Sequence, residues 1–165
     1  MPRHGWLTLS VCRRSSKKSD LGAPLSTFDQ ATAERMLTDV FAPWIQDLDL
    51  SIDGLNPEGA TLRMPFSTRL CRDNGVICGQ ALMSLADTAM VFAVSSVGGA
   101  YRPMTTVDQT MHFLRPAVNA DVLAEAKVVR LGRTMAFGSV TLTTDGDTRP
   151  VAIAQLAYAL LPEGK

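Results

Sequence analysis

A long apolar run in the middle of the chain constrains the fold more than any other feature. Residues 80–97 are mostly Ala, Leu, Met, Val and Phe, and Asp87 is the single charged residue between Asn74 and Tyr101. On a helix these side chains would be apolar on every side rather than along one stripe, which is typical of a helix inside a protein. At the usual helical rise the run would be about 27 Å long, the width of a small domain. We therefore expect a core helix with a sheet wrapped around all of its faces.

Two groups on this helix are candidates for chemistry. Gly79 lies where the chain enters the helix, so free backbone N–H groups point outward there with the positive end of the helix dipole behind them. Such an end can stabilise a developing oxyanion. Asp87 places a carboxylate in apolar surroundings, where burial is costly unless the group is paired or functional. The alternatives are structural: Asp87 could accept hydrogen bonds from Ser84 or Thr88, and Gly79 could form only a tight entry turn.

The spacing of these two groups has a consequence for assembly. Asp87 follows Gly79 by eight residues, which is about 12 Å along a helix axis. A carbonyl and its attacking water are only about 3 Å apart, so one helix cannot present both groups to one substrate. Two antiparallel helices from subunits related by a two-fold axis could do so. If both groups are catalytic, we expect a dimer with two shared sites.

Length and charge bound the class of protein. A chain of 165 residues is one domain by the usual prior, and we expect a basic N-terminal tail at 1–25, with no assigned function, followed by the domain at 26–165. The 16 basic and 16 acidic residues cancel, so the overall charge gives no reason to expect nucleic acid or an anionic membrane as a partner. Polar residues such as Gln80 and Ser84 along the helix also favour a core helix over a membrane span.

The cysteines indicate the compartment. Cys12, Cys71 and Cys78 form no CxxC pair and have no His at ligand spacing. They are interpreted as reduced thiols, without a zinc site or a disulfide framework. We therefore expect a cytoplasmic protein that binds no metal.

Periodicity and turn signals divide the rest of the chain. An amphipathic helix is expected at 28–41, ended by Pro43, and residues 44–55 are interpreted as an irregular segment with turns. One strand before the core helix and four consecutive strands after it predict an α+β protein, with an antiparallel sheet curled round one helix. These strands are expected at 60–65, 104–114, 120–131, 135–144 and 149–161.

The strand expected at 104–114 alternates between two faces. His112 in this strand is interpreted as structural rather than as an acid or base. Val107, Met111 and Phe113 are expected on one face, with Thr106, Asp108, Thr110 and His112 on the other.

Three short motifs, in order around these elements, carry a family resemblance. Leu85-Ala86-Asp87-Thr88-Ala89 resembles the helix segment with the catalytic acid in the hotdog-fold acyl-CoA thioesterases. His112-Phe113-Leu114-Arg115-Pro116 resembles a strand ending of that family, and Leu131-Gly132-Arg133 resembles its next turn. The chain is most similar to the phenylacetate-pathway (PaaI-like) branch of the 4-hydroxybenzoyl-CoA thioesterase superfamily. This resemblance implies a hotdog fold.

The resemblance also implies roles for residues at matching positions. Gly79 matches the glycine whose backbone N–H polarises the thioester carbonyl. Asp87 matches the carboxylate, from the other subunit, that acts as general base for water or as nucleophile. Thr106 matches a polar residue that helps to hold water. Arg115 and Arg133 could meet the phosphates of coenzyme A, although turn arginines usually face solvent.

The helix entry departs from the family pattern. The family usually has His-Gly-Gly, whereas this chain has Cys78-Gly79-Gln80. Arg72 stands where many members have asparagine, and Asn74 is close enough to substitute. We expect Asn74, Cys78 and Gln80 to contribute to substrate binding. The helix-end donor does not depend on the missing histidine side chain, so we do not interpret the change as inactivation.

The predicted function is hydrolysis of an aryl- or medium-chain acyl-CoA to the free acid and coenzyme A. We expect a homodimer or a dimer of dimers (a homotetramer) that needs no cofactor beyond the coenzyme A of its substrate. The alternative is a non-catalytic acyl-CoA-binding hotdog protein, a sensor or scaffold, which the altered helix entry motivates. A hotdog hydratase fits less well, because it needs a His near the helix entry. The flexible side chains expected to line the acyl pocket are Met83, Met90, Phe92 and Met111.

Overall fold

One sheet and one long helix make up most of the domain. The computed structural model describes residues 28–162, so the predicted tail at 1–25 lies outside the described residues. The elements in chain order are α1 (Gln30–Asp39), α2 (Pro43–Gln46), β1 (Ser51–Asn56), β2 (Gly59–Met64), η1 (Thr68–Leu70), η2 (Asp73–Gly75), α3 (Gly79–Gly98), β3 (Met104–Phe113), β4 (Val122–Leu131), β5 (Met135–Thr144) and β6 (Asp147–Leu160).

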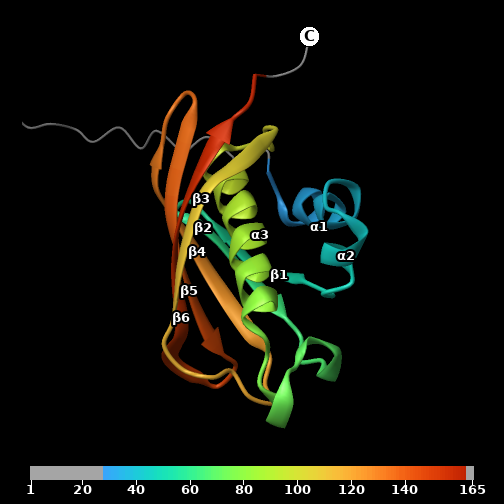
Figure 1. Ribbon diagram of the computed structural model, residues 1–165. Helices are drawn as coiled ribbons and strands as arrows, with labels where there is room; N and C mark the ends of the chain where they lie inside the picture. The colour runs from blue at the N-terminus through green and yellow to red at the C-terminus, as the bar shows by residue number, and fades with distance from the viewer. Residues whose placement is uncertain (1–27, 163–165) are drawn as a thin grey trace, which may run out of the picture.

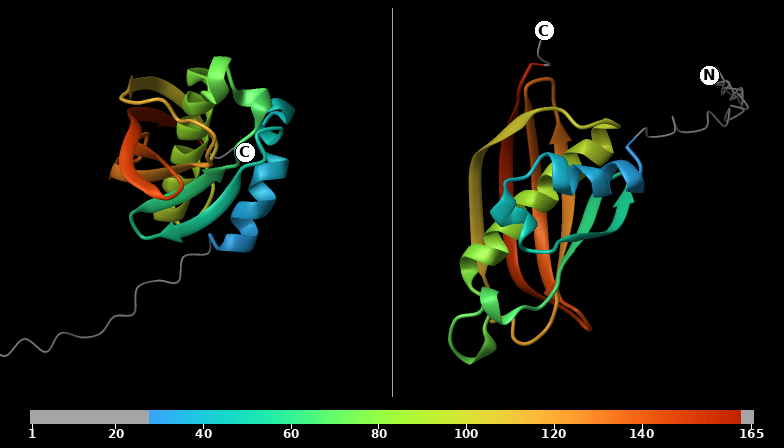
Figure 2. Two further views of the ribbon diagram at one scale, coloured as in Figure 1. Left: turned by 90° about the horizontal axis from the view of Figure 1, so that it is seen from below. Right: turned by 90° about the vertical axis from the view of Figure 1, so that its right-hand side faces the viewer.

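The strands form a six-stranded antiparallel sheet in the order β1-β2-β4-β5-β6-β3. The sheet curls round α3, and α1 and α2 lie on the other side of that helix (Figures 1 and 2). β1 and β3 are the edge strands. This α+β arrangement, an antiparallel sheet wrapped around one central helix, is the hotdog fold, and it confirms the predicted fold class.

α3 confirms the predicted core helix. It begins after the extended Cys78 and ends at Gly99, whose left-handed φ of 76° suits a glycine at the end of a helix. All residues from Thr88 to Ser96 are buried. The helix is long and apolar enough to cross a membrane, but 72% of its most apolar window is buried inside the fold, as in the core helix of a soluble protein.

The first half of α3 leaves one stripe uncovered. Gln80, Met83, Ser84 and Asp87 recur at the spacing of one helical face. Gln80 and Met83 are exposed, and Ser84 and Asp87 are half-buried. The prediction that the sheet buries every face of the helix is therefore wrong for this stripe, because the sheet ends beside it at the edge strand β3.

Aromatic contacts hold α1 over the buried half of α3. Asp29 caps α1 by accepting a hydrogen bond from the backbone N–H of Thr32 at 2.9 Å. Phe41, just after α1, stacks on Phe92 of α3 with 5.6 Å between ring centroids. The ring of Phe28 lies 6.5 Å from the same Phe92 ring. The helix predicted here is confirmed, although its regular part is shorter.

The segment interpreted as irregular, 44–55, contains most of a strand that the sequence pattern missed. Ile52 is the one buried residue of β1, because this edge strand is covered on one side only. A bulge between Ile52 and Gly54 breaks its alternation further, so that Asp53-Gly54 resembles a turn signal. Pro43 also has a second role: it occupies the first position of the short helix α2, where a proline is well tolerated.

A bulge in β3 reverses part of the predicted alternation. Two consecutive residues of β6 pair with Thr106 and Asp108, so that Val107 is an extra residue on β3. Because side chains in a strand alternate with a period of two, one extra residue moves the preceding side chains to the other face. The prediction that Thr106 lies opposite Met111 and Phe113 is therefore wrong, and all three residues lie on the helix side of β3.

Gly138 of β5 makes room for α3, and this generates a prediction about stability. A Cβ at this position would lie 2.5 Å from Sδ of Met90 and 2.6 Å from the backbone oxygen of Lys127. We expect Gly138→Ala to lower the free energy of unfolding by about 1–3 kcal/mol, measured by urea denaturation. The matched control is Gly54→Ala, because a Cβ at Gly54 would meet nothing within 4 Å. Equal losses in the two variants would contradict the packing argument.

Candidate active site

The backbone N–H groups at the start of α3 are unpaired. The chain before the helix is anchored, because the N–H of Ile77 donates to the carbonyl of Ala117 at 3.0 Å and that of Cys78 to the carbonyl of Leu70 at 2.8 Å. Gly79 is the first helical residue, and within the described part of the chain its N–H and the next two find no acceptor. The Cys78 side chain makes no cap. The positive end of the helix dipole is therefore open to a ligand.

An apolar cavity of about 510 Å³ adjoins this helix start. Gly79 forms part of its wall, and the ring of Phe113 lies 3.1 Å from the position that a Cβ on Gly79 would take. A side chain at this position would crowd the ring, so the glycine suits this wall. The volume is in the usual range for small-molecule sites. Other wall residues are Arg72, Val76, Ile77, Leu82, Leu114, Arg115, Pro116 and Ala117.

The carboxylate of Asp87 is half-buried, and two strands supply its hydrogen-bond donors. The hydroxyl of Thr106 on β3 donates to Oδ1 at 2.9 Å. The hydroxyl of Tyr158 on β6 donates to the same Oδ1 at 2.5 Å. Ser84, one of the donors considered for a purely structural Asp87, donates instead to the carbonyl of Gln80 at 2.8 Å. Asp87 is thus held by the sheet and not by its own helix.

Tyr158 is a residue of this site that the sequence reasoning missed. Its side chain is only 1% exposed. Burial, and then the charge of Asp87 and the hydrogen bond to it, raise the pKa of Tyr158. The hydroxyl therefore stays protonated and acts as a donor. A signal for this contact was available: the alternation of the last strand puts Tyr158 on the face that is buried, and a buried tyrosine hydroxyl usually needs a partner.

Gly79 and Asp87 both lie on the β3 side of α3, near opposite ends of that strand. Gly79 is next to Phe113, the last residue of β3. Asp87 contacts Thr106, near the first. Their separation along α3 is about 12 Å at the usual helical rise. Within one subunit, therefore, the two groups cannot contact the same carbonyl group.

The other residues predicted to bind substrate lie around the helix start. Cys78 is the half-buried N-cap of α3, and Gln80 is exposed in its first turn. Asn74 lies in η2 with a left-handed φ of 60° and is exposed. The wall of the cavity contains Arg72 rather than Asn74. Arg72, noted above only as a departure from the family pattern, was not among the residues predicted to bind substrate, yet it belongs to this wall.

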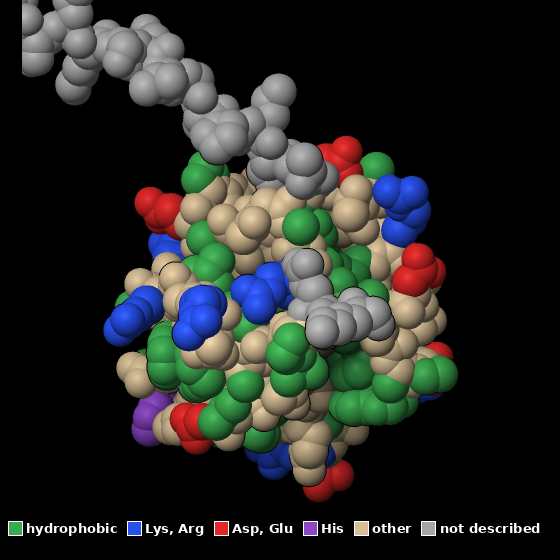
Figure 3. Space-filling model, turned by 90° about the horizontal axis from the view of Figure 1, so that it is seen from above, with side chains coloured by type: hydrophobic (Ala, Val, Ile, Leu, Met, Phe, Trp, Pro, Cys, Tyr) green, Lys and Arg blue, Asp and Glu red, His purple; other side chains and the backbone are tan. Residues whose placement is uncertain are grey.

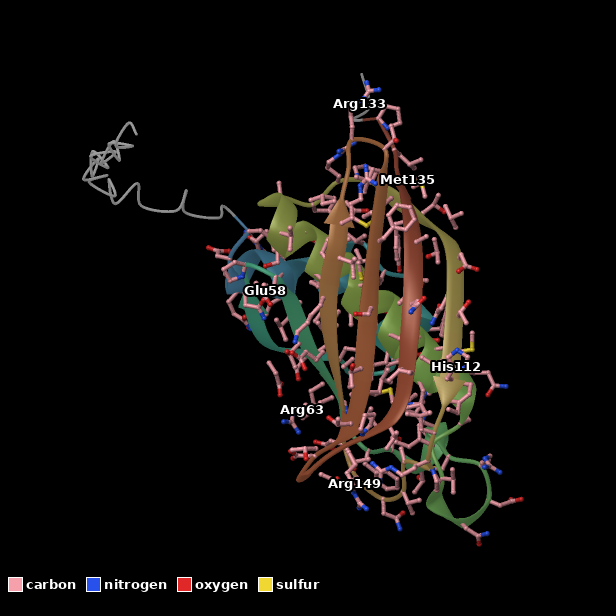
Figure 4. The ribbon with its side chains drawn as sticks, turned by 90° about the vertical axis from the view of Figure 1, so that its left-hand side faces the viewer. Glu58, Arg63, His112, Arg133, Met135 and Arg149 are labelled. Atoms are coloured by element: carbon pink, nitrogen blue, oxygen red, sulfur yellow. The ribbon has the colours of Figure 1, made fainter. Side chains whose placement is uncertain are left out.

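The two arginines predicted to meet coenzyme A lie at opposite ends of the sheet. Arg115 belongs to the wall of the cavity beside Gly79. Its guanidinium donates to Asp147 at 3.3 Å, to the carbonyl of Pro150 at 3.1 Å and to the carbonyl of Arg149. Arg133 is exposed in the β4–β5 turn, at the other end from Arg149 (Figure 4). Basic side chains gather on the end of the molecule that carries this turn (Figure 3). One subunit therefore cannot bring both arginines to the same ligand.

Two of the side chains expected to line the acyl pocket are core residues instead. Met90 and Phe92 are completely buried, and Phe92 stacks on Phe41. The prediction is wrong for these two, because Met90 packs against Gly138 in the sheet and Phe92 faces the α1 region. Met83 is exposed on the uncovered stripe, and Met111 is half-buried on the helix side of β3.

His112 does not belong to this site. It pairs with Ile153 on the outer face of the sheet and is exposed there, away from α3 (Figure 4).

Among residues 28–162, no group of three or more His, Cys, Asp or Glu side chains could hold a metal ion.

Comparison with known proteins gives the family. Residues 74–151, which include both Gly79 and Asp87, match the family model of the thioesterase superfamily. A crystal structure from Silicibacter sp. TM1040, titled "putative thioesterase", is 31% identical in sequence. It superposes with a TM-score of 0.74, and the match covers 82% of this chain and 93% of that one. The chain therefore belongs to the thioesterase superfamily, and it is a thioester hydrolase.

Two further relatives are similar over most of the domain. A Halobacterium salinarum protein named "putative esterase" is 29% identical over 115 residues, which are 67% of this chain and 76% of the relative. The E. coli PaaI protein, from the phenylacetic acid degradation operon, is 21% identical with a TM-score of 0.69, and the match covers 79% of this chain and 91% of that one. At this identity the PaaI comparison shows a shared fold.

Proposed function

We propose that this protein hydrolyses an aryl- or medium-chain acyl-CoA to the free acid and coenzyme A, in active sites that two subunits share. The observation that carries this proposal is the pair of groups on α3. The unpaired N–H of Gly79 adjoins an apolar cavity, and the carboxylate of Asp87 is held in place farther along the same side of the helix. The proposed hydrolysis uses both groups, and one chain keeps them apart.

The edge strand β3 supports a dimer. None of its ten residues is buried, and Val107 and Phe113 are 59% and 51% exposed. A long unpaired edge with exposed apolar side chains is a ready template for pairing with another strand. We propose that two copies of the chain pair antiparallel through β3 across a two-fold axis. A homotetramer would then be a pair of such dimers, each with two complete sites.

This pairing would bring the two halves of the site together. β3 runs from Thr106, beside Asp87, to Phe113, beside Gly79. When two such strands pair antiparallel about their middle, the start of one lies beside the end of the other. The carboxylate of Asp87 in one subunit would then face the helix start of the partner subunit.

The same pairing suggests where the substrate would lie. The cavity beside Gly79 has an apolar wall that includes Leu82 and Phe113, and this wall suits an aryl or medium-length acyl group. Antiparallel pairing would also bring the partner subunit's Arg133 toward the end of the molecule that carries Arg115. Because Asp147 already engages Arg115, Arg133 would supply more of the contact with the coenzyme A phosphates.

The proposed reaction uses a main-chain amide, a carboxylate and water. The N–H of Gly79 donates to the thioester oxygen as it becomes an oxyanion, and one such donor contributes roughly 3–4 kcal/mol in other enzymes. Asp87 accepts a proton from water while the water oxygen bonds to the carbonyl carbon. The C–S bond then breaks, and the departing sulfur takes the proton from Asp87, so that coenzyme A leaves as its thiol. Alternatively, Asp87 attacks the carbonyl carbon and displaces the thiolate, and water hydrolyses the resulting anhydride.

This scheme involves no metal or prosthetic group. We also propose that the reaction takes place in the cytoplasm. Cys71 and Cys78 are free thiols. Free thiols on a small domain support a reducing compartment.

The first experiment measures thiol release from a panel of aryl- and medium-chain acyl-CoAs. We expect Asp87→Asn to lower kcat roughly 100-fold or more, because the amide cannot accept the proton of water. Asp39→Asn, at an exposed position on α1, is the matched control and should keep the wild-type rate. Equal rates for the wild type and Asp87→Asn would exclude a catalytic role for Asp87. Tight binding by the wild type without thiol release would favour the non-catalytic alternative.

The second experiment removes only the donor at the helix start. Proline is well tolerated at the first position of a helix, and Cys78, with φ −69° and ψ 150°, already has the extended conformation that proline requires before it. Gly79→Pro therefore deletes one N–H, whereas Gly79→Ala adds a similar Cβ and keeps the N–H. We expect kcat of the proline variant to be roughly 100- to 1000-fold below that of the alanine variant. Equal values would contradict the oxyanion role.

The third experiment tests whether two subunits share each site. Gly79→Pro and Asp87→Asn subunits are each expected to be inactive alone. In a mixed dimer, one site would combine the intact Gly79 of one subunit with the intact Asp87 of the other. Random mixing after co-expression should restore about a quarter of the wild-type activity, because half of the dimers are mixed and have one intact site of two. No recovery, with mixed dimers shown by differential tagging, would contradict the shared site.

A further inference from the structure

Tyr158 is a buried polar side chain that the proposed reaction does not use directly. The side chain is 1% exposed, and its hydroxyl lies between β6 and α3 and reaches Oδ1 of Asp87 at 2.5 Å. The backbone oxygen of Asp87 lies 2.8 Å from the same hydroxyl. A tyrosine with one polar atom buried among apolar neighbours has a fixed position, because its ring cannot move without disturbing the core. Tyr158 is thus a rigid donor.

A second donor approaches the same carboxylate oxygen from the neighbouring strand. Thr106 pairs with Tyr158 across β3 and β6, and its hydroxyl donates to Oδ1 at 2.9 Å. The bulge at Val107 makes this arrangement possible, because it turns Thr106 to the helix side of the sheet. Within the described residues, Oδ2 of Asp87 accepts no hydrogen bond. The carboxylate therefore has one anchored oxygen and one free oxygen.

We propose that Tyr158 is a positioning residue that, together with Thr106, anchors Oδ1 of Asp87 and thereby makes Oδ2 the reacting oxygen. This inference rests on the proposed catalytic role of Asp87. A carboxylate on a helix can otherwise turn about its χ2 bond and exchange its two oxygens. With Oδ1 held by the hydroxyls of Tyr158 and Thr106, the carboxylate keeps one orientation, and Oδ2 stays free of protein donors among the described residues. Catalysis is sensitive to such misplacement of a reacting group.

The orientation matters in either chemical route. As a general base, Oδ2 takes the proton of the attacking water, and Oδ1 keeps its two hydrogen bonds throughout. As a nucleophile, Oδ2 forms the bond to the carbonyl carbon, and Oδ1 becomes the carbonyl oxygen of the anhydride, still within reach of both donors. The protonated state of Tyr158 suits both routes, because burial raises the pKa of its hydroxyl.

The test removes the Tyr158 hydroxyl and measures steady-state kinetics with the best acyl-CoA of the panel. We expect Tyr158→Phe to lower kcat roughly 10- to 100-fold and to leave KM within twofold of the wild-type value. Tyr101→Phe is the matched control. Tyr101 is the only other tyrosine of the chain, is 36% exposed after α3, and should tolerate the change with wild-type kcat. Urea unfolding of all variants separates a kinetic effect from loss of folded enzyme.

A double-mutant cycle distinguishes positioning from a structural effect. If Tyr158 acts through the Asp87 carboxylate, Tyr158→Phe should cause no further loss of rate in the Asp87→Asn background. The same fold-loss in both backgrounds would overturn the inference, as would wild-type kcat in Tyr158→Phe. An inactive Asp87→Asn with a fully active Tyr158→Phe would contradict this inference alone. A fully active Asp87→Asn would contradict the proposed function, on which the inference depends.

Discussion

The apolar surface of α3 determines much of the rest of the structure. A helix with apolar side chains on every side is stable only where other elements cover it. The curled sheet covers one side and the α1 region covers another, with Phe41 stacked on Phe92. The cover stops at β3, an edge strand in which no residue is buried. The stripe left open contains Asp87, so a partner that completes the cover of the helix would also reach the carboxylate.

The parts of the fold that could be predicted have signals that are local and repeated. The strand expected at 135–144 forms β5 with the same bounds. The core helix expected at 80–97 is α3, with one more residue at each end. Asp87 could be singled out because a lone charge in an apolar run stands out without any knowledge of its partners. Gly79 could be singled out because it begins that run.

The parts that could not be predicted depend on contacts between distant segments. The bulge at Val107 has no signature of its own, because any residue can be the extra one and only the pairing with β6 reveals it. The alternation was therefore applied to the wrong register, and Thr106 was placed on the wrong face. β1 was missed for a related reason: one buried residue and a bulge leave no pattern to detect. The contact of Tyr158 with Asp87 required both the register and the packing of the sheet on α3.

Hydrogen bonding in the site distinguishes the atoms that are held in place from the atoms that are free to react. Buried backbone and side-chain polar groups are nearly always paired, and an N-cap side chain often satisfies the first donors of a helix. Cys78 leaves those donors open, whereas Oδ1 of Asp87 has two donors. In the proposed reaction, the oxyanion meets a donor with no competing partner, and water meets a carboxylate with one orientation. Because that donor is a main-chain N–H, replacing the family's usual histidine with Cys78 changes a side chain beside the site and leaves the stabilising group in place.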